Sequence, residues 1–198
     1  MDNQTLHTYN KSAKQLADKF AGIGSRKADV KRAFELRGKA NPRVLELGCG
    51  DGRDAKEILK GTKNYAGIDY SSELIELARA KNPKTKFEVR DMLTYDFGSG
   101  LDIIFAFASL LHVDKTNVTT ILEQAKKSLS TGGIFYISLK KDSYQSKVQT
   151  DEFGTRIFYY YEPKDIEEIK PNTLKTVFLD HQTIGYTDWF TIALQKTT

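Results

Sequence analysis

The sequence has a single cysteine and no long apolar run, and each shortage argues against a class of protein. Cys49 alone cannot form an intramolecular disulfide, so we expect a protein of the reducing cytoplasm. No stretch approaches the roughly 20 apolar residues of a membrane-spanning helix. The segment 1–14 is polar and lacks the apolar centre of a secretory signal. We therefore expect a protein that is neither secreted nor embedded in a membrane.

The sequence also lacks a spacing of residues typical of a metal site, and its net charge is small. The three histidines, His7, His112 and His181, form no spacing with cysteine or carboxylates that is typical of a metal site. Thirty basic against 26 acidic side chains leave a formal charge of +4, which is too small to require a nucleic-acid partner. This surplus fits either an anionic substrate or a solvated, lysine-rich surface. We expect no metal site and no binding to nucleic acid or to a membrane.

The segment 44–54, VLELGCGDGRD, is the most informative part of the chain. A short apolar run and an acidic residue precede glycines at alternate positions, which predicts a strand that enters a glycine loop. Glycine suits such a loop because the turn demands unusual backbone angles and because the main chain must approach a ligand closely. A helix over about 53–59 would then direct its free N–H groups at the ligand.

Two further strand ends carry carboxylates. Asp69 ends the strand expected at 65–69, where it could accept hydrogen bonds from both hydroxyls of a ribose. Asp91 and Met92 follow the strand expected at 87–89. Asp91 could bind an adenine amine while Met92 packs on the ring. A nucleoside-like ligand is therefore predicted.

The motifs resemble those of class I S-adenosylmethionine-dependent methyltransferases of the small, single-domain kind. Five segments occur in the order of that family, within a region from about residue 9 to residue 196: ELGCGDG at 46–52, GIDYS at 67–71, RDM at 90–92, DIIFAFASLLHV at 102–113 and SLSTGGIFYISL at 128–139. The main alternative is a nicotinamide-dinucleotide protein, whose fingerprint is GxGxxG. The GxGxG loop that follows Glu46 suits the methyl donor better.

The resemblance implies S-adenosyl-L-methionine as the cofactor. The residues expected to bind it are Tyr9, Glu46, Gly48, Gly50, Asp69, Tyr70, Asp91, Met92 and Phe107. Cys49 is expected to fit the tight turn rather than to act as a catalytic thiol.

The expected fold is a single α/β domain over 1–198, a length that suits one buried core. Its centre is a doubly wound, seven-stranded, mostly parallel sheet of the Rossmann-like methyltransferase type, closed by an antiparallel C-terminal strand hairpin. A first helix is expected from Tyr9 to Phe20 and a second over about 26–36. The domain divides into N-terminal cap helices at 1–40, a cofactor-binding core at 41–139, a possible substrate lid at 140–161, and a helix and strand hairpin at 162–198.

Substrate residues are expected outside the cofactor motifs. The polar stretch 140–154 predicts a loop, either a lid over the substrate or a plain surface loop. In the following segment, taken as a strand, Phe158 and Tyr160 would be core while Tyr159 and Tyr161 face outward. Arg156 and Tyr159 could instead line an acceptor pocket, with Arg156 binding a carboxylate or phosphate.

His112 is the candidate catalytic residue. It follows the fourth strand, near the place where donor and acceptor should meet, and its imidazole could remove a proton from an acceptor hydroxyl or amine. It could equally cap a helix or fix the loop.

The function expected is methyl transfer to an oxygen or nitrogen of a small molecule by a monomer or homodimer. FAFAS at 105–109 stands where the enzymes that methylate base amines carry Asn/Asp-Pro-Pro-aromatic, which argues against a nucleic-acid substrate. Two alternatives stay open. The chain could bind the donor or its product without turnover, as a sensor or inactive subunit, or it could methylate tRNA or protein with a partner chain.

Overall fold

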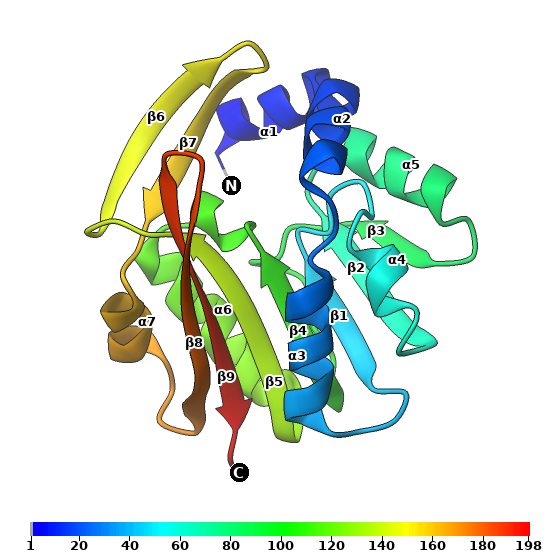
Figure 1. Cartoon of the computed structure of the whole chain (residues 1–198), viewed down its shortest axis with the longest axis vertical. Coiled ribbons are helices and arrows are strands. Elements are labelled where there is room, and N and C mark those ends of the chain that lie inside the picture. Colours follow the sequence, from blue (N-terminus) through cyan, green and yellow to red (C-terminus); the bar gives the residue numbers. More distant parts are fainter. Residues whose placement is uncertain (1) are drawn as a thin grey trace.

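A seven-stranded sheet organises the computed structural model, which describes residues 2–198 (Figure 1). The strand order is β3-β2-β1-β4-β5-β9-β8. The bounds are β1 (Arg43–Leu47), β2 (Asn64–Asp69), β3 (Lys86–Val89), β4 (Leu101–Phe107), β5 (Leu129–Lys140), β8 (Leu174–Ile184) and β9 (Thr187–Lys196). The first five strands are parallel, whereas β9 is antiparallel to β5 and to β8. The predicted fold class, including the C-terminal hairpin, is confirmed.

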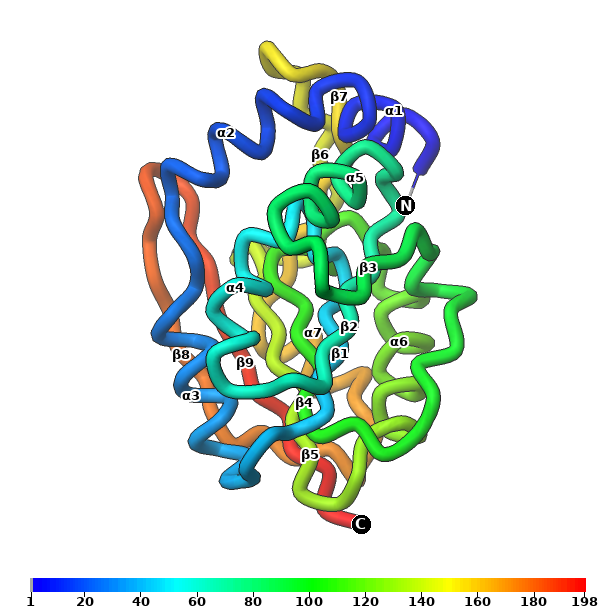
Figure 2. Tube along the Cα trace, turned by 90° about the vertical axis from the view of Figure 1, so that its right-hand side faces the viewer, coloured from blue at the N-terminus to red at the C-terminus, as the bar shows by residue number. Residues whose placement is uncertain are grey.

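Helices cover both faces of the sheet (Figure 2). One face carries α3 (Lys27–Arg37), α4 (Ala55–Ile58) and α5 (Ser72–Lys81), and the other carries α6 (Lys115–Ser128) and α7 (Pro163–Ile169). Side chains alternate between the two cores because successive strand residues point to opposite faces. Val44 and Ile103 join the core under α3 to α5, whereas Leu45 and Ile104 join the core under α6. The central strand β4 is buried along its whole length, as a strand covered on both faces requires.

The N-terminal region forms two helices where one was predicted. α1 (Asn3–Lys11) and α2 (Ala13–Ile23) are separated at Ser12, whose hydroxyl donates to the Phe153 carbonyl at 2.7 Å. The apolar periodicity indicated one continuous helix, but this long-range contact accompanies a break in the helix at Ser12. α2 continues three residues past the predicted end at Phe20, and Gly24 ends it with a φ of 82°.

The segment 140–154 is not the loop that its polar composition indicated. β6 (Gln145–Asp151) pairs in antiparallel register with β7 (Gly154–Tyr160), and this hairpin stands beside α1 above the sheet (Figure 1). The prediction failed because β6 is largely exposed and so has few apolar residues. Two contacts hold the hairpin to α1: the Thr8 hydroxyl donates to the Thr155 carbonyl at 2.7 Å, and the Ile157 N–H donates to Thr5 Oγ1 at 2.9 Å.

The aromatic segment alternates in burial as expected within β7, but not at Tyr161, which follows the strand. Phe158 and Tyr160 are buried, as predicted, and Tyr159 is half-buried. Tyr161 was expected to face outward but is fully buried. It lies beyond the last residue of β7, where the strand alternation no longer applies, and its hydroxyl donates to the Val113 carbonyl at 2.5 Å.

A buried carboxylate ties the amino end of β4 to the end of α3 and to the segment between α3 and β1. Asp102 is 1 % exposed and accepts hydrogen bonds from Arg37 Nη2 at 2.7 Å, Lys39 Nζ at 2.8 Å and the Arg43 N–H at 2.9 Å. Burial alone would raise the pKa of Asp102, but these donors outweigh it and lower the pKa to about 2. The carboxylate therefore stabilises the fold in its charged form.

We expect Asp102→Asn to lower the free energy of unfolding at pH 7 by about 3 kcal/mol, because it leaves two cations without their shared partner. The wild-type contribution is present above the unfolded pKa and is lost as pH falls from about 4 to about 2, since the folded pKa is the lower one. Urea unfolding checks both statements, with Asp180→Asn on exposed β8 as the matched control. Equal stability of the two variants at pH 7 would contradict this role for Asp102.

Candidate functional site

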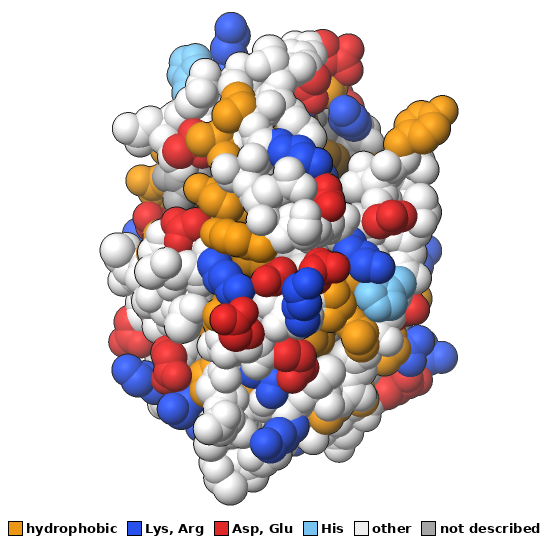
Figure 3. Space-filling view, turned by 90° about the vertical axis from the view of Figure 1, so that its left-hand side faces the viewer, with side chains coloured by type: hydrophobic (Ala, Val, Ile, Leu, Met, Phe, Trp, Pro, Cys, Tyr) orange, Lys and Arg blue, Asp and Glu red, His pale blue; other side chains and the backbone are white. Residues whose placement is uncertain are grey.

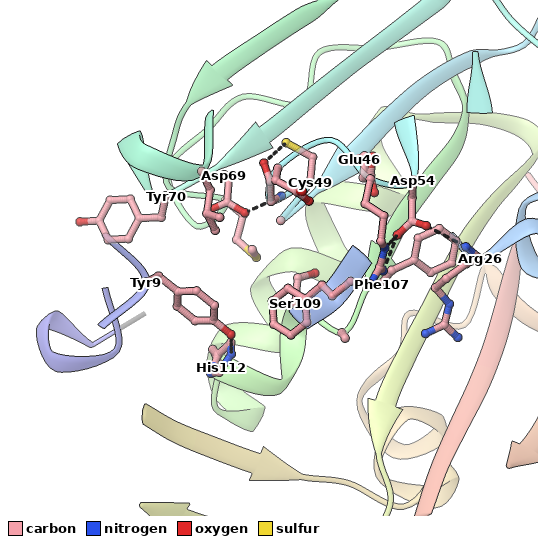
Figure 4. Close-up of a pocket in the computed structure, with 18 of the residues that line it drawn as sticks. Tyr9, Arg26, Glu46, Cys49, Asp54, Asp69, Tyr70, Phe107, Ser109 and His112 are labelled. Carbon is pink, nitrogen blue, oxygen red and sulfur yellow. Dashed lines mark hydrogen bonds and ion pairs between the residues drawn. The ribbon is translucent and has the colours of Figure 1, made fainter. Parts of the chain in front are cut away.

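A cavity of about 250 Å³ lies at the carboxyl ends of the central strands and is also lined by residues of α1 and α2. Figure 4 shows side chains that line it. In open α/β sheets this edge is where ligands bind. Its walls come from the loops after β1, β2, β3 and β4, from the two N-terminal helices, and from the β8–β9 hairpin.

The glycine loop after β1 forms the floor. The N–H groups of Gly48 and Cys49 both donate to the Ile68 carbonyl, at 2.8 and 3.0 Å. Gly48 and Gly50 have positive φ values, 71° and 54°. A Cβ on Gly48 would lie 2.3 Å from the Cβ of Ser109, so only glycine fits the gap between these two loops. The sequence prediction of a tight glycine turn is confirmed in its geometry.

Asp69 is anchored to this loop. Its Oδ2 accepts the Gly50 N–H and its Oδ1 accepts the Ser71 N–H, both at 2.9 Å. Burial raises the pKa of Asp69, and the N–H donors partly offset that effect. Each carboxylate oxygen can accept a second hydrogen bond. The fixed carboxylate therefore offers two adjacent acceptor positions to a diol in the cavity.

Glu46 faces the same floor from β1. Its Oε2 accepts the Tyr65 hydroxyl at 2.5 Å, and burial together with the nearby Asp54 raises its pKa well above the ordinary value. Asp54 accepts the Arg26 N–H at 2.8 Å and pairs with Arg53 Nη2 at 2.7 Å. Sequence reasoning missed these three residues: Asp54 and Arg53 directly follow the glycine loop and could have been included, whereas nothing in the sequence pointed to Arg26.

Tyr9 and His112 meet on the opposite side of the cavity (Figure 4). The His112 Nδ1 lies 2.7 Å from the Ile157 carbonyl, which can only accept, so Nδ1 carries the proton. Nε2 then accepts the Tyr9 hydroxyl at 2.8 Å. Burial lowers the pKa of His112 to about 4 and raises that of Tyr9 to about 12. His112 is thus neutral at physiological pH, and both of its ring nitrogens are occupied.

The cavity brings together every residue expected at the cofactor site. Its lining includes Tyr9, Glu46, Gly48, Gly50, Asp69, Tyr70, Asp91, Met92, Phe107 and His112. Their binding and catalytic roles remain predictions. The two candidate substrate residues do not line it: Tyr159 is half-buried on β7, and Arg156 is buried with its guanidinium carbon 5.8 Å from the centre of the Tyr9 ring.

Residues 2–198 contain no cluster of three or more His, Cys, Asp and Glu residues arranged for a metal ion. They also contain no helix long and apolar enough to cross a membrane. Cys49 is buried and burial raises the pKa of its thiol well above the ordinary value, which suits a structural place in the loop.

Comparisons with known proteins agree with this geometry. Residues 44–133 match the family model described as a methyltransferase domain. The chain is 29 % identical over 99 residues to trans-aconitate 2-methyltransferase of Rhizobium rhizogenes and 30 % identical over 102 residues to malonyl-[acyl-carrier protein] O-methyltransferase 1 of Ilyobacter polytropus. Each match covers 49 % of this chain and 38 % of the relative.

The fold resembles that of a solved enzyme. N-methyltransferase NodS from Bradyrhizobium japonicum, in complex with S-adenosyl-L-homocysteine, superposes with a TM-score of 0.70 at 16 % identity, over 87 % of this chain and 86 % of that one.

We expect Gly48→Ala to destabilise the protein by about 3 kcal/mol or more, because the added methyl group meets Ser109 and the backbone keeps its positive φ. Gly50→Ala is the matched control. Its φ is also positive, but nothing lies within 4 Å of the new Cβ, so about 1 kcal/mol is expected. Thermal and urea unfolding measure both. The double variant Gly48→Ala/Ser109→Gly should regain part of the loss, and no regain would contradict the contact.

Proposed function

We propose that the chain is a class I S-adenosylmethionine-dependent methyltransferase that transfers a methyl group from this donor to an oxygen or nitrogen of a small molecule. The observation that carries the proposal is the Asp69 carboxylate, which Gly50 and Ser71 hold against the glycine loop. The O-methyltransferase among the relatives favours oxygen as the acceptor atom. The chain spans well under half the length of these relatives, so their substrates are a guide only.

The residues of the cavity fit the donor. We propose that Asp69 binds the ribose hydroxyls, that Asp91 accepts the adenine amine, and that Met92 packs on the adenine ring. The Asp91 Oδ1 already accepts the Leu93 N–H at 3.0 Å, which fixes the carboxylate at the strand end. The glycine loop allows backbone N–H groups to approach the ligand without an intervening side chain. When bound, the donor supplies a methyl group on a sulfonium leaving group.

The protein's contribution to transfer is positioning and the exclusion of water. α1, α2 and both hairpins cover the carboxyl ends of the strands (Figure 1). The predicted action of His112 as a base would need its Nε2 lone pair, which already accepts the Tyr9 hydroxyl. We therefore propose that His112 positions Tyr9 in the cavity wall, and that Tyr9 contacts the donor or the acceptor.

The charge distribution on the surface also favours a small acceptor over nucleic acid. On the face shown in Figure 3, basic and acidic side chains are interspersed and form no continuous basic tract, whereas binding of nucleic acid relies on such tracts. We further propose a cytoplasmic enzyme, in which the single buried cysteine stays reduced, acting as a monomer or homodimer.

Turnover is tested by release of S-adenosyl-L-homocysteine. The protein is incubated with the donor and, separately, with the small-molecule, RNA and protein fractions of a bacterial extract. We expect product only with the small-molecule fraction. Product only with a macromolecular fraction would favour the tRNA or protein alternative, and tight binding without product in any fraction would favour a sensor.

Asp69→Ala should weaken binding of S-adenosyl-L-homocysteine at least tenfold while the protein stays folded, because the ribose loses two acceptors whose bonds to a charged group are worth about 1.5 to 3 kcal/mol each. Asp69→Asn, which keeps one acceptor oxygen, should fall between Ala and wild type. Isothermal calorimetry measures affinity and circular dichroism the fold, with Asp180→Ala as the surface control. Unchanged affinity in a folded Asp69→Ala would refute the assignment.

A further inference from the structure

Two buried or half-buried cations lie beside the Tyr9–His112 pair. Arg156 belongs to β7 and is 7 % exposed, and Lys140 is the half-buried last residue of β5. Both contact the same ring: Lys140 Nζ lies 3.7 Å and the Arg156 guanidinium carbon 5.4 Å from the centre of Phe158. Two positive charges therefore share one aromatic, poorly hydrated environment.

These cations are incompletely paired. Arg156 forms an ion pair with Asp151 through Nη2, but its buried Nε has no hydrogen-bond partner anywhere in residues 2–198. Lys140 Nζ contacts the rings of Phe158 and Tyr160, and no ion pair involving it is found among the described residues. Burial and the charge of Arg156 lower the pKa of Lys140 to about 8. Such unpaired buried donors are costly unless a ligand completes them.

The pair lies at the acceptor side of the cavity. Asp69 and Asp91, at the ends of β2 and β3, mark the nucleoside side. Lys140 is the register partner of Trp189 on β9, and Trp189 lines the cavity. Phe158, between the two cations, packs on His112 with ring centres 4.8 Å apart. Each cation therefore neighbours a residue of the cavity lining: Arg156 lies beside Tyr9 and Lys140 pairs in register with Trp189.

We propose that the acceptor is a carboxylic acid, whose carboxylate is bound by Arg156 and Lys140 and itself receives the methyl group. The inference rests on the proposed function and names its substrate class. Asp151 supplies one negative charge against the two positive charges of Arg156 and Lys140, and the carboxylate of the acceptor supplies the second. This carboxylate can also accept the unpaired Arg156 Nε–H in a charge-assisted bond. An ammonium acceptor would instead meet two positive charges at close range.

The same assignment explains why the reaction does not need His112 as a base. A carboxylate is already deprotonated at neutral pH. Its oxygen lone pair forms the new C–O bond, the C–S bond breaks, and that electron pair goes to sulfur. The products are a methyl ester and S-adenosyl-L-homocysteine, and no proton is released. His112, neutral and bonded through both ring nitrogens, is not required to accept one.

The first test uses Trp189, the single tryptophan of the chain, as a fluorescent reporter. Wild type saturated with S-adenosyl-L-homocysteine is titrated with a panel of aryl and aliphatic monocarboxylates and dicarboxylates, each paired with its primary amide. We expect at least one acid to bind tenfold or more tightly than its amide. If no acid exceeds its amide, the inference is overturned. If S-adenosyl-L-homocysteine itself does not bind, the proposed function fails and the inference with it.

Variants then test the two cations. Lys140→Met and Arg156→Met should each weaken the selected acid at least tenfold and leave its amide and the affinity for S-adenosyl-L-homocysteine unchanged. Lys141→Met, the adjacent residue with the same charge, is the matched control. Arg156→Met removes an ion pair within the hairpin. If Arg156→Met does not fold, the result for Lys140→Met decides alone. An unchanged acid affinity in folded Lys140→Met overturns the inference.

Proton release tests the chemistry. In weakly buffered solution with a pH indicator, methylation of the selected acid should produce S-adenosyl-L-homocysteine without acidification. One proton released for each methyl transferred would identify a hydroxyl or amine acceptor and overturn the inference.

Discussion

The structure depends on the close approach of two loops, the one after β1 and the one after β4. Ser109 donates its hydroxyl to the Leu47 carbonyl at 2.7 Å, and this leaves no space for a side chain at position 48. The same turn bonds to the end of β2 through the Ile68 carbonyl and through Asp69. The carboxyl ends of β1, β2 and β4 are thus joined to one another. These contacts fix the floor of the cavity and the direction of the Asp69 carboxylate.

The side of the cavity proposed to hold the acceptor is built by contacts between distant segments. Tyr9 of α1, His112 after β4 and the Ile157 carbonyl of β7 form one hydrogen-bonded chain, and two threonines of α1 bond to the backbone of the same hairpin. The hairpin therefore lies behind Tyr9 and His112 and fixes their positions in the cavity wall. Phe158 of the hairpin packs on His112, and the Arg156 guanidinium lies over the Tyr9 ring. The residues of the proposed acceptor side are therefore held by the same contacts that hold Tyr9 and His112.

The donor side of the site could be predicted from the sequence because local rules determine it. Gly48, Gly50 and Asp69 each stand at the end of a strand, and parallel strands bring their carboxyl ends to one edge. The acceptor side could not, since it depends on pairings between residues more than 100 positions apart, such as Tyr9 with His112. An exposed strand such as β6 carries no apolar pattern, and a helix break at Ser12 has its cause in Phe153. Neither feature leaves a local signal.

The proposed function requires that the cavity at the carboxyl ends of β1, β2 and β4 binds S-adenosylmethionine. The decisive measurement is calorimetric titration of the folded protein with S-adenosyl-L-methionine and S-adenosyl-L-homocysteine, with a nicotinamide dinucleotide as the control. Binding of the first two in the micromolar range, with none of the dinucleotide, is the predicted result. Binding of the dinucleotide alone, or of none of the three by a protein with intact circular dichroism, would contradict the claim and leave only the fold.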